Sequence, residues 1–212
     1  MAEIDHIVLG ASSLEVGADW VEHHLGVRPQ QGGVHEGFGT HNMLLGLGPA
    51  CYLEVIAPDP NQPAPPHPRP FDLDDPGVRS MLEAEPRLLA WVARTPVFDA
   101  VVARLGPRAG EVKEMRRGDL HWRMAFPPQR QDLDNLVPAL IHWNGAGASS
   151  RLKDSKCRLK LLEAEHPDDG AVRAALAERG LEEVMKVRRS PHPRLLAHLV
   201  RPDGAEVTFS SG

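Results

Sequence analysis

The stretch Asp5-His6-Ile7-Val8-Leu9 places a histidine inside a run of apolar residues close to the amino terminus. Successive side chains of a β-strand point to opposite faces of the sheet. His6 is therefore expected to share a face with Val8, while Ile7 and Leu9 point the other way. A polar side chain in such a strand is a candidate for the lining of a pocket.

Two later strand-like segments carry a polar residue in a comparable place. Glu54 lies in Cys51-Tyr52-Leu53-Glu54-Val55-Ile56, and His142 lies in Ala139-Leu140-Ile141-His142-Trp143. Two imidazoles and one carboxylate on apolar strands are the ingredients of a three-ligand metal site with open positions. Each residue alone is more simply explained as a hydrogen-bonded pocket residue, so the metal prediction depends on the three strands meeting.

Composition sets limits on the class of protein. Hydrophobic residues make up 42% of the 212 residues, which is typical of a folded globular chain. The net charge of −5 and the scattered basic residues argue against nucleic-acid binding. No apolar run is long enough for a membrane span, no signal peptide is recognisable, and the two cysteines indicate no disulfide framework. These features predict a cytoplasmic protein.

An extended apolar segment followed by a helix and three strand-like segments occurs three times. The helices are expected at 13–25, 96–105 and 168–179, and each is followed by a glycine suited to a helix end: Gly26, Gly106 and Gly180. Each unit thus reads βαβββ, which predicts an α+β fold built from repeated modules.

The repeats define the expected organisation of the chain. The first module covers 1–57, the second 87–145 and a third, βαβββ-like unit 157–212, all within one compact domain. Residues 58–86 form a connection that is rich in proline as far as Pro76 and is followed by a short helix. Proline fixes φ and cannot donate to a strand ladder, so this connection is expected to be a stiff linker or a lid over a pocket. A ligand for an SH3-type domain is the alternative.

The order and spacing of these motifs resemble the vicinal oxygen chelate superfamily, and more closely its glyoxalase-like domain branch. The resemblance rests on the Asp5–Leu9 strand, a helix ending in Leu25-Gly26, the turn Gly39-Thr40-His41-Asn42 and the strand around Glu54. It implies two paired modules whose strands form a cupped mixed sheet around a central cavity, with the third unit at the carboxyl end. It also implies metal ligands on the first and last strands of each module.

Carried over to this chain, that rule selects His6, Glu54 and His142 as metal ligands. Aligning the second module on the first puts Ala90 opposite His6, and alanine cannot bind a metal. This departs from the four-ligand pattern of glyoxalase I and argues against that activity. The remaining set could hold Fe(II), Mn(II), Ni(II) or Zn(II).

Four further residues are candidates for binding a substrate. Tyr52 shares a face with Glu54, and His41 follows the turn before a strand. His121 and Arg123 lie in a later strand and could contact an anionic group. For His41, His121 and Arg123, a place at the surface or rim is the simpler explanation.

Three functions remain open from the sequence. The first is a metal-dependent isomerase, lyase or dioxygenase acting on a small molecule with vicinal oxygens, whose charge the metal would stabilise. The second is a metal-free protein that binds or sequesters a small molecule in the same cavity, as in bleomycin resistance. The third is a structural or interaction role through a homodimer.

Overall fold

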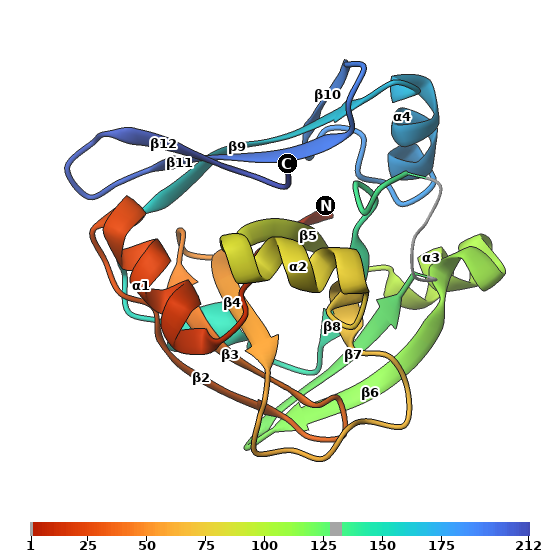
Figure 1. Cartoon of the computed structure of the whole chain (residues 1–212). Helices are drawn as coiled ribbons and strands as arrows, with labels where there is room; N and C mark the ends of the chain where they lie inside the picture. Colours follow the sequence, from red (N-terminus) through yellow and green to blue (C-terminus); the bar gives the residue numbers. More distant parts are fainter. Residues whose placement is uncertain (1, 128–132) are drawn as a thin grey trace.

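The computed structural model of the chain describes residues 2–127 and 133–212, so residues 128–132 of the second module lie outside the described part. The βαβββ order expected from the sequence is confirmed in all three units (Figure 1). The first module comprises β1 (Glu3–Gly10), α1 (Leu14–Leu25), β2 (Gln30–His35), β3 (Thr40–Gly46) and β4 (Tyr52–Pro58). The second comprises β5 (Arg87–Arg94), α3 (Phe98–Leu105), β6 (Glu111–Arg117), β7 (Leu120–Phe126) and β8 (Ala139–Trp143).

The third unit and the connection complete the chain. The third unit contains β9 (Arg158–His166), α4 (Asp169–Ala177), β10 (Lys186–Arg189), β11 (Arg194–Val200) and β12 (Glu206–Ser210). The proline-rich connection contains a 3-10 turn at Pro70–Asp72 and the helix α2 (Pro76–Ala84). None of the helices in the described ranges is long and apolar enough to cross a membrane.

Helix α1 shows how local sequence sets the bounds of an element. The Ser13 hydroxyl accepts a hydrogen bond from the backbone N–H of Val16 at 3.3 Å, which caps the first turn. At the other end Gly26 adopts a φ of 74° and donates its N–H to the carbonyl of Glu22. The buried residues of the helix recur at helical spacing and attach it to the sheet: Leu14, Gly17, Ala18, Val21 and Leu25.

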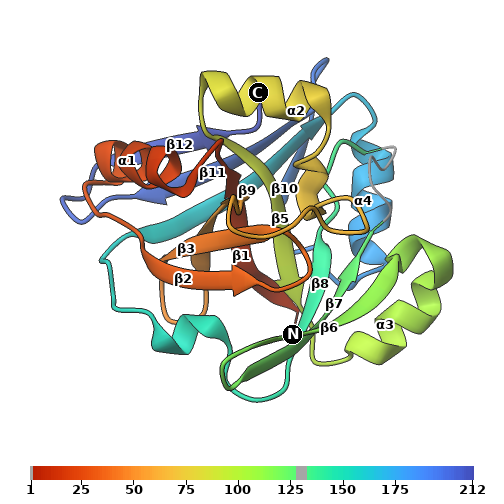
Figure 2. The ribbon, with the colours of Figure 1, turned by 60° about the horizontal axis from the view of Figure 1, so that its bottom comes forward.

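The first two modules form one curled eight-stranded sheet in the order β2-β3-β4-β1-β5-β8-β7-β6. At its centre β1 and β5 pair antiparallel, and each is flanked by a parallel partner, β4 or β8. Figure 2 shows the orange strands of the first module on one side and the green strands of the second on the other, with β1 and β5 between them. The outermost strands β2 and β6 contact each other, so the sheet curls into a cup.

The third unit has the same order of elements but a different pairing of strands. Its own four-stranded sheet runs β10-β9-β11-β12, so the first strand of the unit lies between the second and the third. In the first two modules the first strand instead pairs with the fourth. The third unit is therefore similar to the modules in sequence pattern and distinct in topology, and it does not extend the cup.

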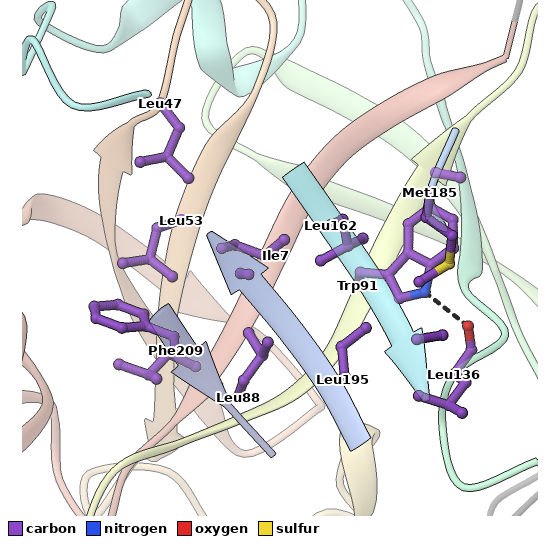
Figure 3. Packing of buried hydrophobic residues seen from close by; sticks show 14 of the residues in the cluster. Ile7, Leu47, Leu53, Leu88, Trp91, Leu136, Leu162, Met185, Leu195 and Phe209 are labelled. Carbon is purple, nitrogen blue, oxygen red and sulfur yellow. Dashed lines mark hydrogen bonds between the residues drawn. The ribbon is translucent and has the colours of Figure 1, made fainter. Parts of the chain in front are cut away.

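The main hydrophobic core lies between the two sheets, on the convex side of the cup. Figure 3 shows Leu162 and Leu195 of the small sheet packed against Ile7 and Trp91 of the large one. The Trp91 ring is fully buried, and its Nε1–H donates to the carbonyl of Leu136 at 2.9 Å. A second apolar cluster lines the concave side. The third unit thus covers the back of the cup and leaves its interior for a ligand.

Candidate binding site in the cup

A charged cluster lies on the concave face where β1 and β4 run side by side. The parallel pairing sets Val8 opposite Glu54, and the ring of His6, two residues before Val8, approaches the same carboxylate. His6 Nε2 lies 3.4 Å from Glu54 Oε2, and the Tyr52 ring stacks on His6 with centroids 4.6 Å apart. All three residues are buried. The structure therefore brings together three of the residues selected from the sequence.

Asp5 completes this cluster through an irregularity in β1. The register between β1 and β5 shifts between Ile4 and His6, so Asp5 has no partner across the pair. Its carboxylate lies beside the neighbouring ring, with Oδ1 2.8 Å from His6 Nδ1, and its other oxygen accepts from Trp143 Nε1 at 2.9 Å. His6 is thus held between two carboxylates, those of Asp5 and Glu54.

Asn42 links the cluster to the edge strands. Its amide nitrogen donates to Glu54 Oε1 at 2.6 Å and to His35 Nε2 at 3.1 Å. Its amide oxygen accepts from the backbone N–H of Gly33 at 2.9 Å and from Arg117 Nη1 at 3.0 Å. All the hydrogen-bonding capacity of this buried amide is used, which fixes its orientation.

The electrostatic environment fixes the charges of the central pair. Burial alone would lower the pKa of His6, but the hydrogen bonds and negative charges of Asp5 and Glu54 outweigh it and raise the pKa to about 9. Burial would raise the pKa of Glu54, but His6, the charge of His35 and the Asn42 amide lower it to about 2. At neutral pH the cluster therefore contains an imidazolium and a carboxylate. His35 differs, because burial lowers its pKa.

These shifts predict that the protein is most stable between about pH 4.5 and 6.5. His6 titrates at 6.5 when unperturbed, so its stabilising contribution is complete below that pH and is lost as the pH rises through about 9. Glu54 titrates at 4.5 when unperturbed, so its contribution is complete above that pH and is lost as the pH falls through about 2. Urea unfolding should show the free energy of unfolding falling by about 3 kcal/mol between pH 6 and pH 9. A His6→Gln variant should lack this alkaline decrease, and an equal decrease in both proteins would contradict the assignment.

Two neighbouring chambers occupy the cup. The polar chamber has a volume of about 40 Å³. It is lined by His6, Tyr52 and Glu54 of the charged cluster together with His35, Asn42 and Arg117. The apolar chamber has a volume of about 300 Å³, and its walls include Phe71, Ala90, Phe126, Val137 and Ala139. Phe38, Pro70, Phe71 and Phe126 line both chambers.

The proline-rich connection supplies Pro70 and Phe71 to the wall that the two chambers share, as expected of a segment that covers a pocket. Phe71 has a φ of 59° and Asp72 one of 57°, a left-handed conformation that is uncommon for bulky residues. Asp72 is anchored through its Oδ2, which accepts from Asn135 Nδ2 at 3.0 Å. The strained backbone therefore holds the Phe71 ring between the chambers.

The two chambers occupy corresponding positions in the two modules. Across the central pair, His6 lies opposite Val92, and Val8 lies opposite Ala90, so Ala90 corresponds to His6 as expected from the sequence. Glu54 pairs with Val8, whereas the residue that pairs with Val92 is Ala139. Both module-two positions are thus alanines, and both line the apolar chamber.

By this correspondence Ala139, and not His142 as expected from the sequence, takes the second-module position equivalent to Glu54. His142 lies three positions beyond Ala139, and strand alternation turns it away from Ile141 and Trp143, which line the polar chamber. His142 instead lines a separate depression with Arg94 and Thr95, and its ring lies 5.9 Å from that of Phe98. The structure does not bring His142 together with His6 and Glu54.

Strand alternation also places three of the expected substrate-binding residues outside the chambers. His41 points away from the cup, with Nδ1 3.8 Å from Asp59 Oδ1, while its neighbour Asn42 points inward. Arg123 forms a bidentate ion pair with Asp99 and lies over the Phe98 ring. His121 is exposed in a rim depression. Of the four expected substrate-binding residues, Tyr52 alone lines a chamber.

The donor set does not fit a resident metal ion. In residues 2–127 and 133–212, no group of three or more histidine, cysteine or acidic side chains has a metal-binding arrangement. Both oxygens of Glu54 already contact donors, Asn42 and His6, and His35 Nε2 accepts from Asn42. The second module offers the methyl groups of Ala90 and Ala139 where further ligands would be needed.

Comparison with known proteins agrees with this architecture. The model of the family described as "Glyoxalase-like domain" matches residues 4–180. The chain belongs to this family. Its matched region includes both modules and the first strand and helix of the third unit. No curated protein matches the chain significantly.

Solved structures similar to this glyoxalase-like domain have low sequence identity to it. A hypothetical protein from Staphylococcus aureus superposes with a TM-score of 0.58 and 16% identity, covering 100% of this chain and 86% of that one. Methylmalonyl-CoA epimerase from Mycobacterium tuberculosis gives a TM-score of 0.43 and 20% identity over 68% of this chain and 89% of that one. A Streptomyces coelicolor methylmalonyl-CoA epimerase variant in complex with 2-nitronate-propionyl-CoA gives a TM-score of 0.44 and 19% identity. The match covers 68% of this chain and 95% of that one.

Proposed function

We propose that this glyoxalase-like domain is a metal-free binding protein that holds a small, largely apolar molecule in the cup. The observation that carries the proposal is the replacement of both module-two ligand positions by Ala90 and Ala139. Their small side chains line the apolar chamber of about 300 Å³, a volume at the lower end of those found for small-molecule sites.

The chemistry of the polar cluster supports binding over proton transfer. A general acid or base works best when its pKa lies near the working pH. The pKa of His6 is raised to about 9 by its two carboxylate neighbours, and that of Glu54 is lowered to about 2. At neutral pH each group is fixed in its charged form, which suits it to orient a bound polar group.

A neutral fluorescent probe tests the proposal directly. N-phenyl-1-naphthylamine should bind the wild-type protein with enhanced fluorescence. Ala90→Leu should weaken this binding by about tenfold, because the added methylene and methyl groups fill the apolar chamber. Ala103→Leu, at an exposed position of α3, provides the matched control and should bind the probe as the wild type does. Equal affinities in all three proteins would place the probe elsewhere and contradict the proposal.

The metal content of the protein tests the other function considered from the sequence. Elemental analysis after purification without a tag or chelator should find no stoichiometric transition metal, including after incubation with Fe(II), Mn(II), Ni(II) and Zn(II). About one equivalent in the wild type that is lost in His6→Ala would overturn the metal-free proposal. It would instead favour the metal-dependent enzyme.

A further inference from the structure

Arg117 is a cation of the polar chamber whose guanidinium forms no direct ion pair with a carboxylate of the described residues. Arg117 lines this chamber, and its Nη1 donates to Asn42 Oδ1 at 3.0 Å. Within residues 2–127 and 133–212, no carboxylate forms an ion pair with it. Both oxygens of Glu54 are engaged within the buried cluster, by His6 and Asn42.

The fold holds the guanidinium at the chamber by an unusually close approach of two strands. A Cβ built on Gly33 of β2 would lie 2.3 Å from Arg117 Cδ, so the absence of a side chain at Gly33 makes room for the arginine stem. Arg117 acts on the chamber electrostatically, because its positive charge contributes to lowering the pKa of His35. Its position thus follows from the same contact that closes the cup.

The size of the polar chamber restricts what could pair with this cation. Its volume of about 40 Å³ is small, roughly three times the ~10–15 Å³ that suffices for one water molecule on the same measure. A single planar carboxylate is compatible with that space, and a guanidinium is well suited to recognise it. A bulkier phosphoryl group is a poorer match.

The lysine near the ligand space already has a carboxylate partner. Lys113 lines the apolar chamber, but its Nζ lies 2.8 Å from Glu111 Oε2. A negative group in the apolar chamber would therefore compete with Glu111, whereas one in the polar chamber would meet an unpaired guanidinium. The two chambers meet at Phe71 and Phe126, so one elongated molecule could contact both.

We infer that the ligand is an elongated monocarboxylate, with an apolar or aromatic body in the apolar chamber and its carboxylate bound to Arg117. This inference rests on the proposed function, since it assigns a chemical class to the molecule held in the cup. The carboxylate of the ligand would lie in the polar chamber, and its apolar body would lie beside Ala90 and Ala139.

Two probes of nearly equal shape test the inference. 4-Phenylbutanoate and 4-phenylbutanamide differ in charge at one end, and their affinities can be measured by calorimetry. Two tryptophans that line the polar chamber, Trp122 and Trp143, give a second readout through their fluorescence. The carboxylate should bind the wild type about tenfold more tightly than the amide, as expected for a charge-assisted hydrogen bond.

Three charge-removing substitutions on β6 test which residue causes the preference for the carboxylate over the amide. Arg117→Gln should abolish the preference for the carboxylate. Lys113→Gln and the exposed Arg116→Gln should keep it. Loss of the preference in Lys113→Gln instead would overturn the assignment to Arg117, and thermal unfolding of each variant would show that it is folded.

The outcomes separate this inference from the proposed function. Equal affinity of the wild type for the two probes would overturn the carboxylate inference while leaving the apolar binding site in place. Failure of both probes and of N-phenyl-1-naphthylamine to bind would overturn the proposed function and this inference with it. The comparison of probes on the wild type needs no variant, so it remains decisive if Arg117→Gln does not fold.

Discussion

Replacing Asp5 with alanine should lower the free energy of unfolding by about 4 kcal/mol at neutral pH, the range found when one partner of a buried ion pair is removed. The Asp5 carboxylate is 1% exposed and contacts both His6 Nδ1 and Trp143 Nε1. Its removal would leave the charge of His6 with Glu54 alone and a buried indole N–H without its acceptor. Urea unfolding at pH 7 would measure the loss.

Glu3 offers a matched control for this experiment. Both carboxylates form ion pairs with Arg94, at 3.5 Å from Asp5 and 2.8 Å from Glu3, but the Glu3 side chain is exposed. Glu3→Ala should therefore cost less than ~1 kcal/mol. The cost of Asp5→Ala should also shrink above pH 9, where His6 loses its proton in the wild type. Equal costs for the two alanine variants would show that the buried cluster does not stabilise the fold.

Trp91→Ala should destabilise the protein by about 4 kcal/mol, because it opens a large cavity between the two sheets. The indole is fully buried and also donates to the carbonyl of Leu136, which would lose its partner. Denaturant unfolding of the variant beside the wild type would measure the effect.

Trp20→Ala is the matched substitution for Trp91→Ala. Trp20 is a partly exposed tryptophan whose Nε1 donates to Glu85 at 3.1 Å and whose ring contacts Phe209. Its loss should cost less than half as much, because water can fill much of the space left by a partly exposed ring. A cost for Trp91→Ala no greater than that for Trp20→Ala would contradict the assignment of the main core to the region between the sheets.

The succession of helices and strands was predictable because short-range sequence signals determine it. Helix α1 begins after a capping serine and ends at a glycine, and its apolar residues recur at helical spacing. The strands carry runs of apolar residues separated by turn signals. Periodicity and capping depend on near neighbours in the chain, so all three βαβββ units could be recognised. The pairing within the third unit could not, because its sheet order depends on contacts with the rest of the molecule.

The site was only partly predictable because register belongs to the folded sheet. Glu54 was identified correctly as a neighbour of His6. The second-module counterpart of Glu54 was expected at His142, but strand pairing places it three residues earlier in β8, at Ala139. Asp5 lies in the cluster because the strand pairing is irregular at this residue, and no local sequence pattern predicts such an irregularity. Asn42 was detectable in principle. Side chains alternate along the strand that begins at Thr40, so Asn42 points into the cup and His41 points away from it.

The contact between β2 and β6 directs how two copies of the chain could associate through their strands. Unpaired strand edges are templates for adding a strand from another molecule. In the large sheet the two edge strands shield one another across the mouth of the cup, with Gly33 against the stem of Arg117. The small sheet has no such closure, and β10 and β12 form its outer edges. Edge-to-edge pairing of two copies would therefore extend the small sheet behind the cup and leave both ligand chambers open.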